Sequence, residues 1–294
     1  IKSTKILLKY RNKGYIFHGL DVYSYIFIPA LIAKFLGYPV ALKVAAYPSG
    51  FSSSKSSIIL FIRRSTIHFI DKFFAISHEI VDELRGLKVR KDKIKLVYNG
   101  VDIPNYKKSH CQKLSNGSRV ILFTGSVVRR KRPHLLIEAI AKSKNSKAWI
   151  LNLVGPIDDK PYFNKMRAMI KGYGLSERVI FHGFKRDLIE FYTEADLYAL
   201  PSLSEGMPNG VLEAMAHQLP VIISDFSSAN ILCNNTNGYV ANTAKEIAIA
   251  LDLFLENPND FKSKGTMSFE LVDEKFNLSK VAFNYINVFN GFFS

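Results

Sequence analysis

The sequence predicts an α/β protein with two Rossmann-like, doubly wound parallel sheets that face a cleft, the first of them incomplete. The chain has 294 residues, a length that suits one large or two medium-sized domains. Short, nearly continuous apolar runs alternate with helical patterns, as expected for buried parallel strands joined by helices. A polar stretch rich in Lys, Ser and Asn, residues 105–118, separates two such series and predicts a linker.

The first domain is expected to span residues 1–104. Its predicted strands are Tyr15–His18, Val40–Val44, Lys72–Ile76 and Ile94–Val97. Its predicted helices are Tyr23–Leu36, Ser56–Ile70 and His78–Leu87. About four strands are too few for a complete Rossmann-type domain, which usually has two βαβαβ halves. Roughly the first half of such a domain is therefore expected to be absent.

The second domain is expected to span residues 105–294. Its predicted strands are Val120–Thr124, Trp149–Val154, Val179–His182, Leu197–Leu200 and Val221–Ser224. Its predicted helices are Pro133–Lys144, Asp187–Ala195, Pro208–His217 and Thr243–Leu255. The first of these helices has Pro near its first turn and repeats apolar residues on one face. The last segment, Leu278–Phe293, is an apolar and aromatic helix that could pack back on the first domain.

Composition excludes several classes of protein. Hydrophobic residues make up 48% of the chain and charged residues 22%, which excludes wholesale disorder. The two cysteines, Cys111 and Cys233, cannot form a disulfide framework or a Cys-ligated structural zinc site. The longest uncharged stretch, residues 226–244, is rich in Ser, Asn and Thr, so no segment is expected to span a bilayer.

Basic residues are concentrated in the first part of the chain. Residues 1–110 carry 19 of the 40 basic side chains and 7 of the 25 acidic ones, a net charge of 19 − 7 = +12 out of +15. This asymmetry predicts an anionic partner, either a membrane leaflet, a phosphorylated ligand or a nucleic acid, although solubility alone accounts for many basic proteins. Nucleic acid is disfavoured because no recognisable binding module is present. The stretch Ile58–Arg64 could lie on an anionic leaflet or form a buried helix whose Arg side chains reach solvent.

Ligands of open parallel sheets bind beyond the carboxyl ends of the strands, and the loop after Val120–Thr124 is the first candidate site. Gly125 allows close approach of the backbone to a ligand, Ser126 follows it, and four cations occupy residues 129–132 before the next helix. A strand, a glycine turn and a helix with nearby cations can bind a diphosphate. The alternative is a solvated basic turn. Neither a Walker motif nor Gly-x-Gly-x-x-Gly is present, so nicotinamide binding has no support.

A second candidate site follows the strand Leu197–Leu200. Pro208 suits the first position of a helix, and Glu205, Gly206 and Met207 directly precede it. The backbone N–H groups and the positive helix end can hold an anion. Glu213, one to two turns into the helix, can accept hydrogen bonds from vicinal hydroxyls such as those of a ribose. The alternatives are compensation of the helix dipole for Glu205 and an exposed helical position for Glu213.

These segments resemble a known family. Residues 205–216, EGMPNGVLEAMA, are similar to the E-x7-E signature of retaining GT-B glycosyltransferases of family 4, and further similarity covers residues 99–102, 125–139 and 181–184. The resemblance implies a GT-B fold and transfer of a sugar, with retention of configuration, from a UDP- or GDP-linked donor to a lipid-linked or polysaccharide acceptor. The implied location is the cytoplasm or the inner face of the cell membrane. No metal or cofactor is expected, because Asp-x-Asp and His-Glu-x-x-His motifs are absent from the sequence.

The resemblance also implies roles for individual residues. Glu205 would contact the transferred sugar near the reacting carbon, and Lys131 would bind the donor diphosphate. The implied donor-binding residues are Gly125, Ser126, Arg130, Lys131, Phe184, Gly206, Met207, Pro208, Asn209 and Glu213. The sequence departs from the family at Ser126, where Arg is usual, and at Ala45, where His is common. These departures leave a second hypothesis, a relative that binds nucleotide sugar or a partner subunit without catalysis.

Overall fold

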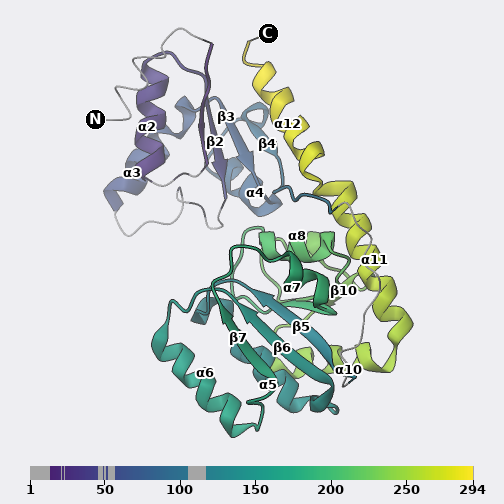
Figure 1. The fold of residues 1–294 in the computed structure, drawn as a ribbon. Helices are drawn as coiled ribbons and strands as arrows, with labels where there is room; N and C mark the ends of the chain where they lie inside the picture. Colours follow the sequence, from purple (N-terminus) through teal and green to yellow (C-terminus); the bar gives the residue numbers. More distant parts are fainter. Residues whose placement is uncertain are drawn as a thin grey trace. The chain divides into compact units, whose positions relative to one another are not determined.

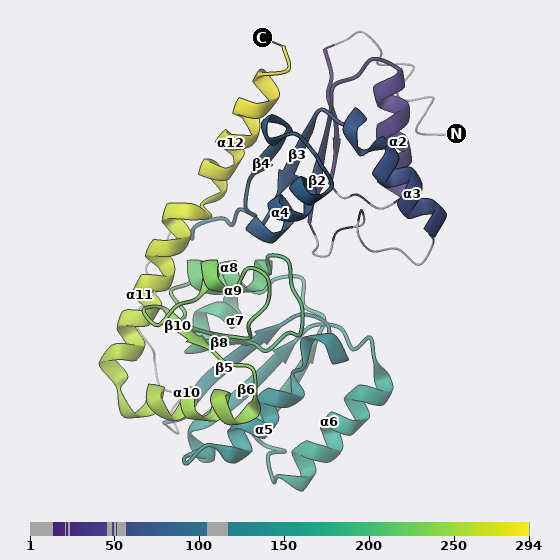
Figure 2. The same ribbon diagram turned by 180° about the vertical axis from the view of Figure 1, so that it is seen from behind.

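The computed structural model describes residues 14–20, 22, 24–45, 49, 51, 57–104 and 117–293. The predicted linker lies outside these residues except at Gly117 and Ser118, and Cys111 lies outside them as well. The chain divides into two compact units (Figures 1 and 2). Unit 1 is Ile1–Gly100 together with Ser279–Ser294, and unit 2 is Val101–Leu278.

Within the described residues, unit 1 contains a four-stranded parallel sheet in the order β1-β2-β3-β4. The strands are β1 (Phe17–Gly19), β2 (Val40–Val44), β3 (Lys72–Ala75) and β4 (Ile94–Leu96). The helices between them are α2 (Ser24–Phe35), α3 (Ser57–Thr66) with the 3₁₀ turn Ile67–Phe69, and α4 (His78–Gly86) with the 3₁₀ turn Lys91–Lys93. Each strand pairs with the next one in the chain, which requires a helical crossover between them. The parallel-sheet domain predicted for the first part of the chain is confirmed.

The core of unit 1 lies on both faces of β3. Phe73 faces α2, because its ring contacts Phe51 at 5.9 Å between centroids and Phe51 in turn contacts Phe27 at 5.5 Å. Phe74, the next residue, points to the opposite face as strand geometry requires. There it meets the C-terminal helix α12 (Leu278–Asn290), whose Tyr285 ring lies 4.3 Å from it. Figures 1 and 2 both show α12 beside β4.

The part of unit 2 that the structure describes forms a six-stranded parallel sheet in the order β10-β9-β8-β5-β6-β7. The strands are β5 (Arg119–Thr124), β6 (Trp149–Val154), β7 (Val179–Gly183), β8 (Leu197–Leu200), β9 (Val221–Ile223) and β10 (Gly238–Val240). The helices are α5 (His134–Lys142), α6 (Lys160–Gly172), α7 (Ile189–Glu194), α8 (Asn209–Ala216), α9 (Ala229–Leu232), α10 (Ala244–Glu256) and α11 (Pro258–Lys275). The chain leaves β5 in one direction and returns to its other side at β8, so the sheet is doubly wound as predicted.

The helix α3 differs from one of its two predicted alternatives. The interpretation of residues 58–64 as a buried helix with solvent-exposed Arg is wrong, because Ile58 and Phe61 are each 72% exposed while Arg63 is buried. The apolar stripe therefore faces outward, and one of its two arginines faces inward. No helix in the described part of the chain is long and apolar enough to cross a membrane.

Candidate functional site

The two predicted loops follow neighbouring strands of the unit 2 sheet. β5 and β8 pair in parallel through Ile121 with Leu197 and Leu122 with Tyr198. Because both strands point the same way, their carboxyl ends meet at one edge of the sheet, and the loops after them lie next to each other. β5 also sits between β8 and β6, where the strand order reverses, and this is where such sheets bind ligands.

The loop after β5 folds back so that Lys131 covers Gly125. Gly125 has φ +128°, a conformation that favours glycine, and a β-carbon built there would lie 2.7 Å from Lys131 Nζ. Gly125 N–H donates to the carbonyl of Val154 (2.8 Å), which ties the start of the loop to β6. The turn Arg129–Lys131 is a single 3₁₀ turn. The backbone angle therefore favours glycine at 125, and any larger residue would also displace the end of the Lys131 side chain.

The two loops are joined by direct hydrogen bonds. Arg132, held at φ +49°, donates from its guanidinium to the carbonyls of Pro201 (2.8 Å) and Ser202 (3.2 Å). In the other direction, Leu203 N–H donates to the carbonyl of Arg130 (2.8 Å). These bonds fix the cation loop against the loop that carries Glu205.

Two cations converge on the Glu205 carboxylate. Its Oε1 lies 2.9 Å from Arg130 Nη1 and 3.5 Å from Lys131 Nζ, and it accepts a hydrogen bond from the Ser202 hydroxyl (2.8 Å). The side chains of Glu205 and Lys131 are 13% and 17% exposed, so water screens this cluster only partly. Two positive charges around one negative charge leave a net positive site. Arg129 does not join it, since that residue pairs with Asp159 (3.1 Å).

The remaining residues of the second loop lead into α8. The helix begins at Asn209, one residue later than predicted. Pro208 is therefore the residue before the helix, and its backbone is extended. Met207 and Pro208 are buried, Gly206 is half-buried and Asn209 is exposed. The first turn of α8 contains no acidic side chain, so its positive end is not neutralised by the helix itself.

Glu213, on the second turn of α8, belongs to a hydrogen-bonded chain of side chains. Tyr192 donates to Glu213 Oε2 (2.7 Å), and Thr124 Oγ1 lies 3.2 Å from the Tyr192 hydroxyl and 3.0 Å from that of Tyr198. Burial raises the pKa of both Tyr192 and Tyr198, so both hydroxyls are neutral at physiological pH. Gly210 packs against this chain, since a β-carbon there would lie 2.5 Å from the Thr124 and Tyr198 hydroxyl oxygens.

Phe184 and Ser126 lie on other parts of the same sheet edge. Phe184 follows β7 and is 72% exposed, and it is separated from the Glu205 cluster by β6. Ser126 is half-buried between Gly125 and the buried Val127.

Gly155, directly after β6, links the loops that follow β5 and β7. Its N–H donates to the carbonyl of Gly183 (2.8 Å), and a β-carbon on it would overlap the carbonyl oxygen of Gly125.

Sequence reasoning missed Tyr192, Thr124 and Gly155 as parts of the site. Gly155 had a signal, because it directly follows an apolar strand as Gly125 does. Thr124 and Tyr192 had none, since a polar residue at a strand end and a tyrosine in a short helix are both ordinary. Only the neighbouring positions of β5, α7, β8 and α8 bring these side chains together.

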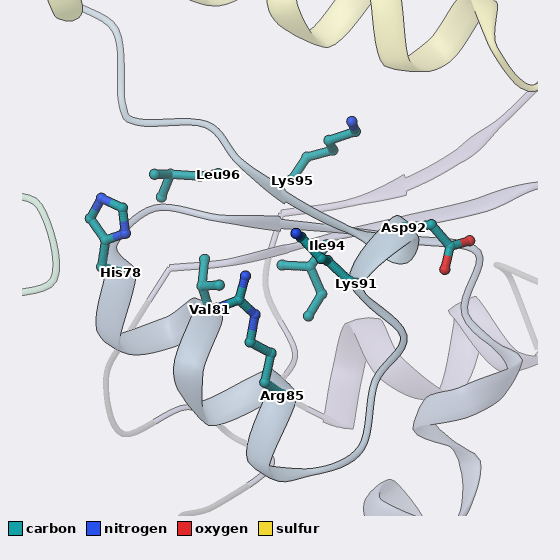
Figure 3. Close-up of a pocket in the computed structure, with 8 residues that line it drawn as sticks. All are labelled: His78, Val81, Arg85, Lys91, Asp92, Ile94, Lys95 and Leu96. Carbon is teal, nitrogen blue, oxygen red and sulfur yellow. The ribbon is translucent and has the colours of Figure 1, made fainter.

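The described residues also contain a cavity that is lined by residues other than the predicted ones. It lies in unit 1 between α4 and β4 and has a volume of about 650 Å³ (Figure 3). It is lined by His78, Val81, Arg85, Lys91, Asp92, Ile94, Lys95 and Leu96. Its cations are exposed and its floor is apolar, and none of the residues predicted for the donor site lines it. In the described ranges no group of three or more His, Cys, Asp and Glu residues could hold a metal ion.

Comparison with known families matches both parts of the chain. Residues 105–266 match the family described as Glycosyl transferases group 1, and residues 15–104 match Glycosyltransferase Family 4. The first match covers more than half of the 294 residues.

Several curated proteins are similar to this chain. One is N-acetylgalactosamine-N,N'-diacetylbacillosaminyl-diphospho-undecaprenol 4-alpha-N-acetylgalactosaminyltransferase of Campylobacter jejuni, 24% identical over 50% of this chain and 39% of the relative. Another is N-acetyl-alpha-D-glucosaminyl L-malate synthase of Bacillus anthracis, 25% identical over 74% and 59%. A third is UDP-Gal:alpha-D-GlcNAc-diphosphoundecaprenol alpha-1,3-galactosyltransferase of Escherichia coli, 27% identical over 58% and 44%. The chain spans about half the length of these relatives.

Solved structures share the fold. Anabaena HepE in complex with UDP superposes with a TM-score of 0.86 at 19% identity, covering 98% of this chain and 82% of that one. Sucrose-phosphate synthase from Thermosynechococcus elongatus gives a TM-score of 0.78 at 18% identity, covering 99% and 77%. The predicted GT-B fold is confirmed.

Proposed function

Because the chain belongs to the glycosyl transferases group 1 family, we propose that it transfers a sugar from a UDP- or GDP-linked donor to a lipid-linked or polysaccharide acceptor. The proposed reaction retains the anomeric configuration and needs no metal ion. The observation that supports it best is the convergence of Arg130 and Lys131 on Glu205 beside the positive end of α8. Further support comes from a similar structure with bound UDP and from relatives named for diphospho-undecaprenol acceptors.

In the proposed mechanism the cation cluster stabilises the leaving group. As the bond between sugar and diphosphate breaks, negative charge grows on the diphosphate, and Lys131 and Arg130 neutralise it. Ser126 stands where the family usually has Arg, and Arg130 supplies the second cation from elsewhere in the same loop. Removing one preorganised group of this kind typically slows a reaction about 10²–10³-fold.

The remaining residues would hold the donor. Glu205 would lie beside the transferred sugar, and the backbone from Gly206 to Asn209 would contact sugar and phosphate. Gly125 and Ser126 would contact the diphosphate, and the loop after Phe184 would contact the base. Glu213 would accept hydrogen bonds from the ribose hydroxyls.

We predict that Lys131→Ala and Glu213→Ala each weaken nucleotide-sugar binding about tenfold or more, because each removes a charged hydrogen-bonding partner. Binding is measured as the rise in melting temperature with UDP- and GDP-sugars, since a ligand that binds only the folded state stabilises it. Lys142→Ala, which removes an exposed cation on α5, is the matched control and should bind as the wild type does. Unchanged binding in both site variants would remove the site assignment. Binding without sugar transfer or hydrolysis by the wild type would favour the non-catalytic alternative.

We also propose that unit 1 contacts an anionic membrane surface through α3. Ile58, Phe61 and Ile62 lie at i, i+3 and i+4 and are exposed together on one side of this helix. Phe69 follows α3, and its ring lies 6.4 Å from that of Phe35 on α2, which is 81% exposed. This apolar face belongs to residues 1–110, which carry a net charge of +12. Exposed apolar side chains together with positive charge suit the surface of a membrane that contains anionic lipids.

The membrane proposal predicts that vesicles with anionic lipids bind the protein more than zwitterionic ones do, and that high salt weakens the binding. The double variant Ile58→Ser and Phe61→Ser should bind anionic vesicles at least tenfold more weakly, because it lacks two apolar side chains whose transfer from water into the membrane favours binding. Ile249→Ser, which removes an exposed apolar side chain from α10 in unit 2, is the control. Co-sedimentation with vesicles measures this, and equal binding to both lipid types would contradict the proposal.

A further inference from the structure

Three hydroxyl groups form a chain that ends on the Glu213 carboxylate. The oxygen atoms of Tyr198 and Thr124 are 3.0 Å apart, those of Thr124 and Tyr192 are 3.2 Å apart, and Tyr192 lies 2.7 Å from Glu213 Oε2. The four residues come from β8, β5, α7 and α8, so the chain crosses four elements of unit 2.

The direction of each hydrogen bond follows from the acceptor at the end. A carboxylate can only accept, so Tyr192 donates to Glu213. The Tyr192 oxygen can then accept from Thr124, whose single proton is used in that bond, and Thr124 accepts in turn from Tyr198. All three O–H dipoles therefore point toward the carboxylate, and hydrogen bonds aligned in this way strengthen one another.

Packing holds Tyr192 in place. It is 2% exposed, and its ring stacks on His217 with 5.0 Å between centroids and 24° between planes. His217 is itself anchored, because its Nδ1 donates to the carbonyl of Glu213 (2.7 Å). Gly210 leaves room for the Thr124 and Tyr198 hydroxyls. A rigid donor aimed at one carboxylate oxygen fixes the rotamer of the whole glutamate.

We infer that Tyr192 is a positioning residue of the donor site: it occupies Oε2 of Glu213 and thereby presents Oε1 to the ribose hydroxyls. This inference rests on the proposed function, which assigns the ribose to Glu213. Without the Tyr192 hydroxyl the carboxylate loses its fixed orientation, and the preorganisation that favours a ribose over a sugar without vicinal hydroxyls is lost.

The test compares two ligands that differ only in those hydroxyls. Affinities of the wild type, Tyr192→Phe and Glu213→Gln are measured by calorimetry for UDP and for 2′,3′-dideoxy-UDP, or for the GDP pair if GDP binds more tightly. The wild type should bind the ribonucleotide about tenfold or more tightly than the dideoxy form. A difference of this size is typical for the loss of a hydrogen bond to a charged group. Tyr192→Phe should lose most of this preference through weaker ribonucleotide binding, while its affinity for the dideoxy form stays within about twofold. Thr124→Val, which removes the donor to Tyr192, should lose a smaller part of it.

Tyr239→Phe is the control, because it removes a tyrosine hydroxyl on β10 that is not part of the hydrogen-bonded row ending at Glu213. It should leave the preference for the ribonucleotide over the dideoxy form unchanged. If Tyr192→Phe keeps the wild-type preference, or weakens both nucleotides equally with a lower melting temperature, Tyr192 has a structural role only and the inference is overturned. If Glu213→Gln also keeps the preference, or the wild type binds neither UDP nor GDP, the assignment of Glu213 to the ribose fails as well.

Discussion

The Glu205 carboxylate shows at the residue scale how two loops become one site. Its Oε1 meets Ser202 from its own loop and Arg130 and Lys131 from the loop after β5. The sequence indicated each of these residue types, apart from Ser202, because charged side chains next to glycines at strand ends are a recognisable pattern. Four consecutive cations occupy residues 129–132, and the sequence by itself does not show which of them reach Glu205. That choice depends on the path of a single 3₁₀ turn, in which Arg129 turns to Asp159 instead.

Gly155 supports a prediction at the same scale. Gly155→Ala should destabilise unit 2 by about 1–3 kcal/mol, because alanine would have to adopt φ +150° and its β-carbon would overlap the carbonyl oxygen of Gly125. Urea unfolding measures the change in the free energy of unfolding. Gly172→Ala, at the end of α6 with open space around it, should be neutral or stabilise by up to about 1 kcal/mol. Equal effects of the two substitutions on the free energy of unfolding would contradict this explanation of Gly155.

At the element scale, most strands could be predicted and a few elements could not. Trp149–Val154 and Leu197–Leu200 are found as predicted, because each is a continuous apolar run buried in a parallel sheet. The helix α6 is not among the predicted helices, although the Asp159 carboxylate accepts from Tyr162 N–H (2.9 Å) and caps it. The helix α11 was missed because it buries polar and small residues, Lys264 and Gly265 among them, so its sequence lacks an apolar stripe.

The contact of α12 with β1 supports a prediction on how the stability of the protein depends on pH. The His18 ring lies among Phe74, Tyr285 and Phe289, and its Nε2 is buried without a hydrogen-bond partner among the described residues. Burial, with a smaller effect of the Lys43 charge, lowers the pKa of His18 below its ordinary value of 6.5. The folded state thus favours the neutral ring, while the unfolded chain takes up a proton as the pH falls through about 6.5.

The contribution of neutral His18 to stability should therefore be fully present above about pH 6.5 and decrease as the pH falls toward its lowered folded-state pKa. Urea unfolding between pH 5 and 8 measures the slope. His18→Phe should make the loss of stability on acidification shallower than in the wild type, whereas His68→Phe, at an exposed position of the same unit, should leave it as it is. A slope that is unchanged in His18→Phe would contradict this explanation.

At the scale of the whole molecule, the chain forms two parallel-sheet units with different charge. The N-terminal part carries most of the net positive charge and the exposed apolar face of α3, and unit 2 carries the candidate donor site. Unit 1 is not continuous in sequence, since α12 follows unit 2 but packs on the sheet of unit 1. That packing joins residues about two hundred positions apart, and apolar periodicity alone does not say which surface an amphipathic helix covers.

The sequence by itself determined the class of fold, the positions of most strands and helices, and the two loops where chemistry is expected. These follow from local properties: apolar periodicity, glycine and proline at element ends, and charged residues beside them. Only the tertiary structure decided which side chains meet. Tyr192 and Thr124 reach Glu213 because β5 lies beside β8 and the helices that follow the strands fold over them. Contacts between residues distant in sequence depend on strand order, which no local pattern records.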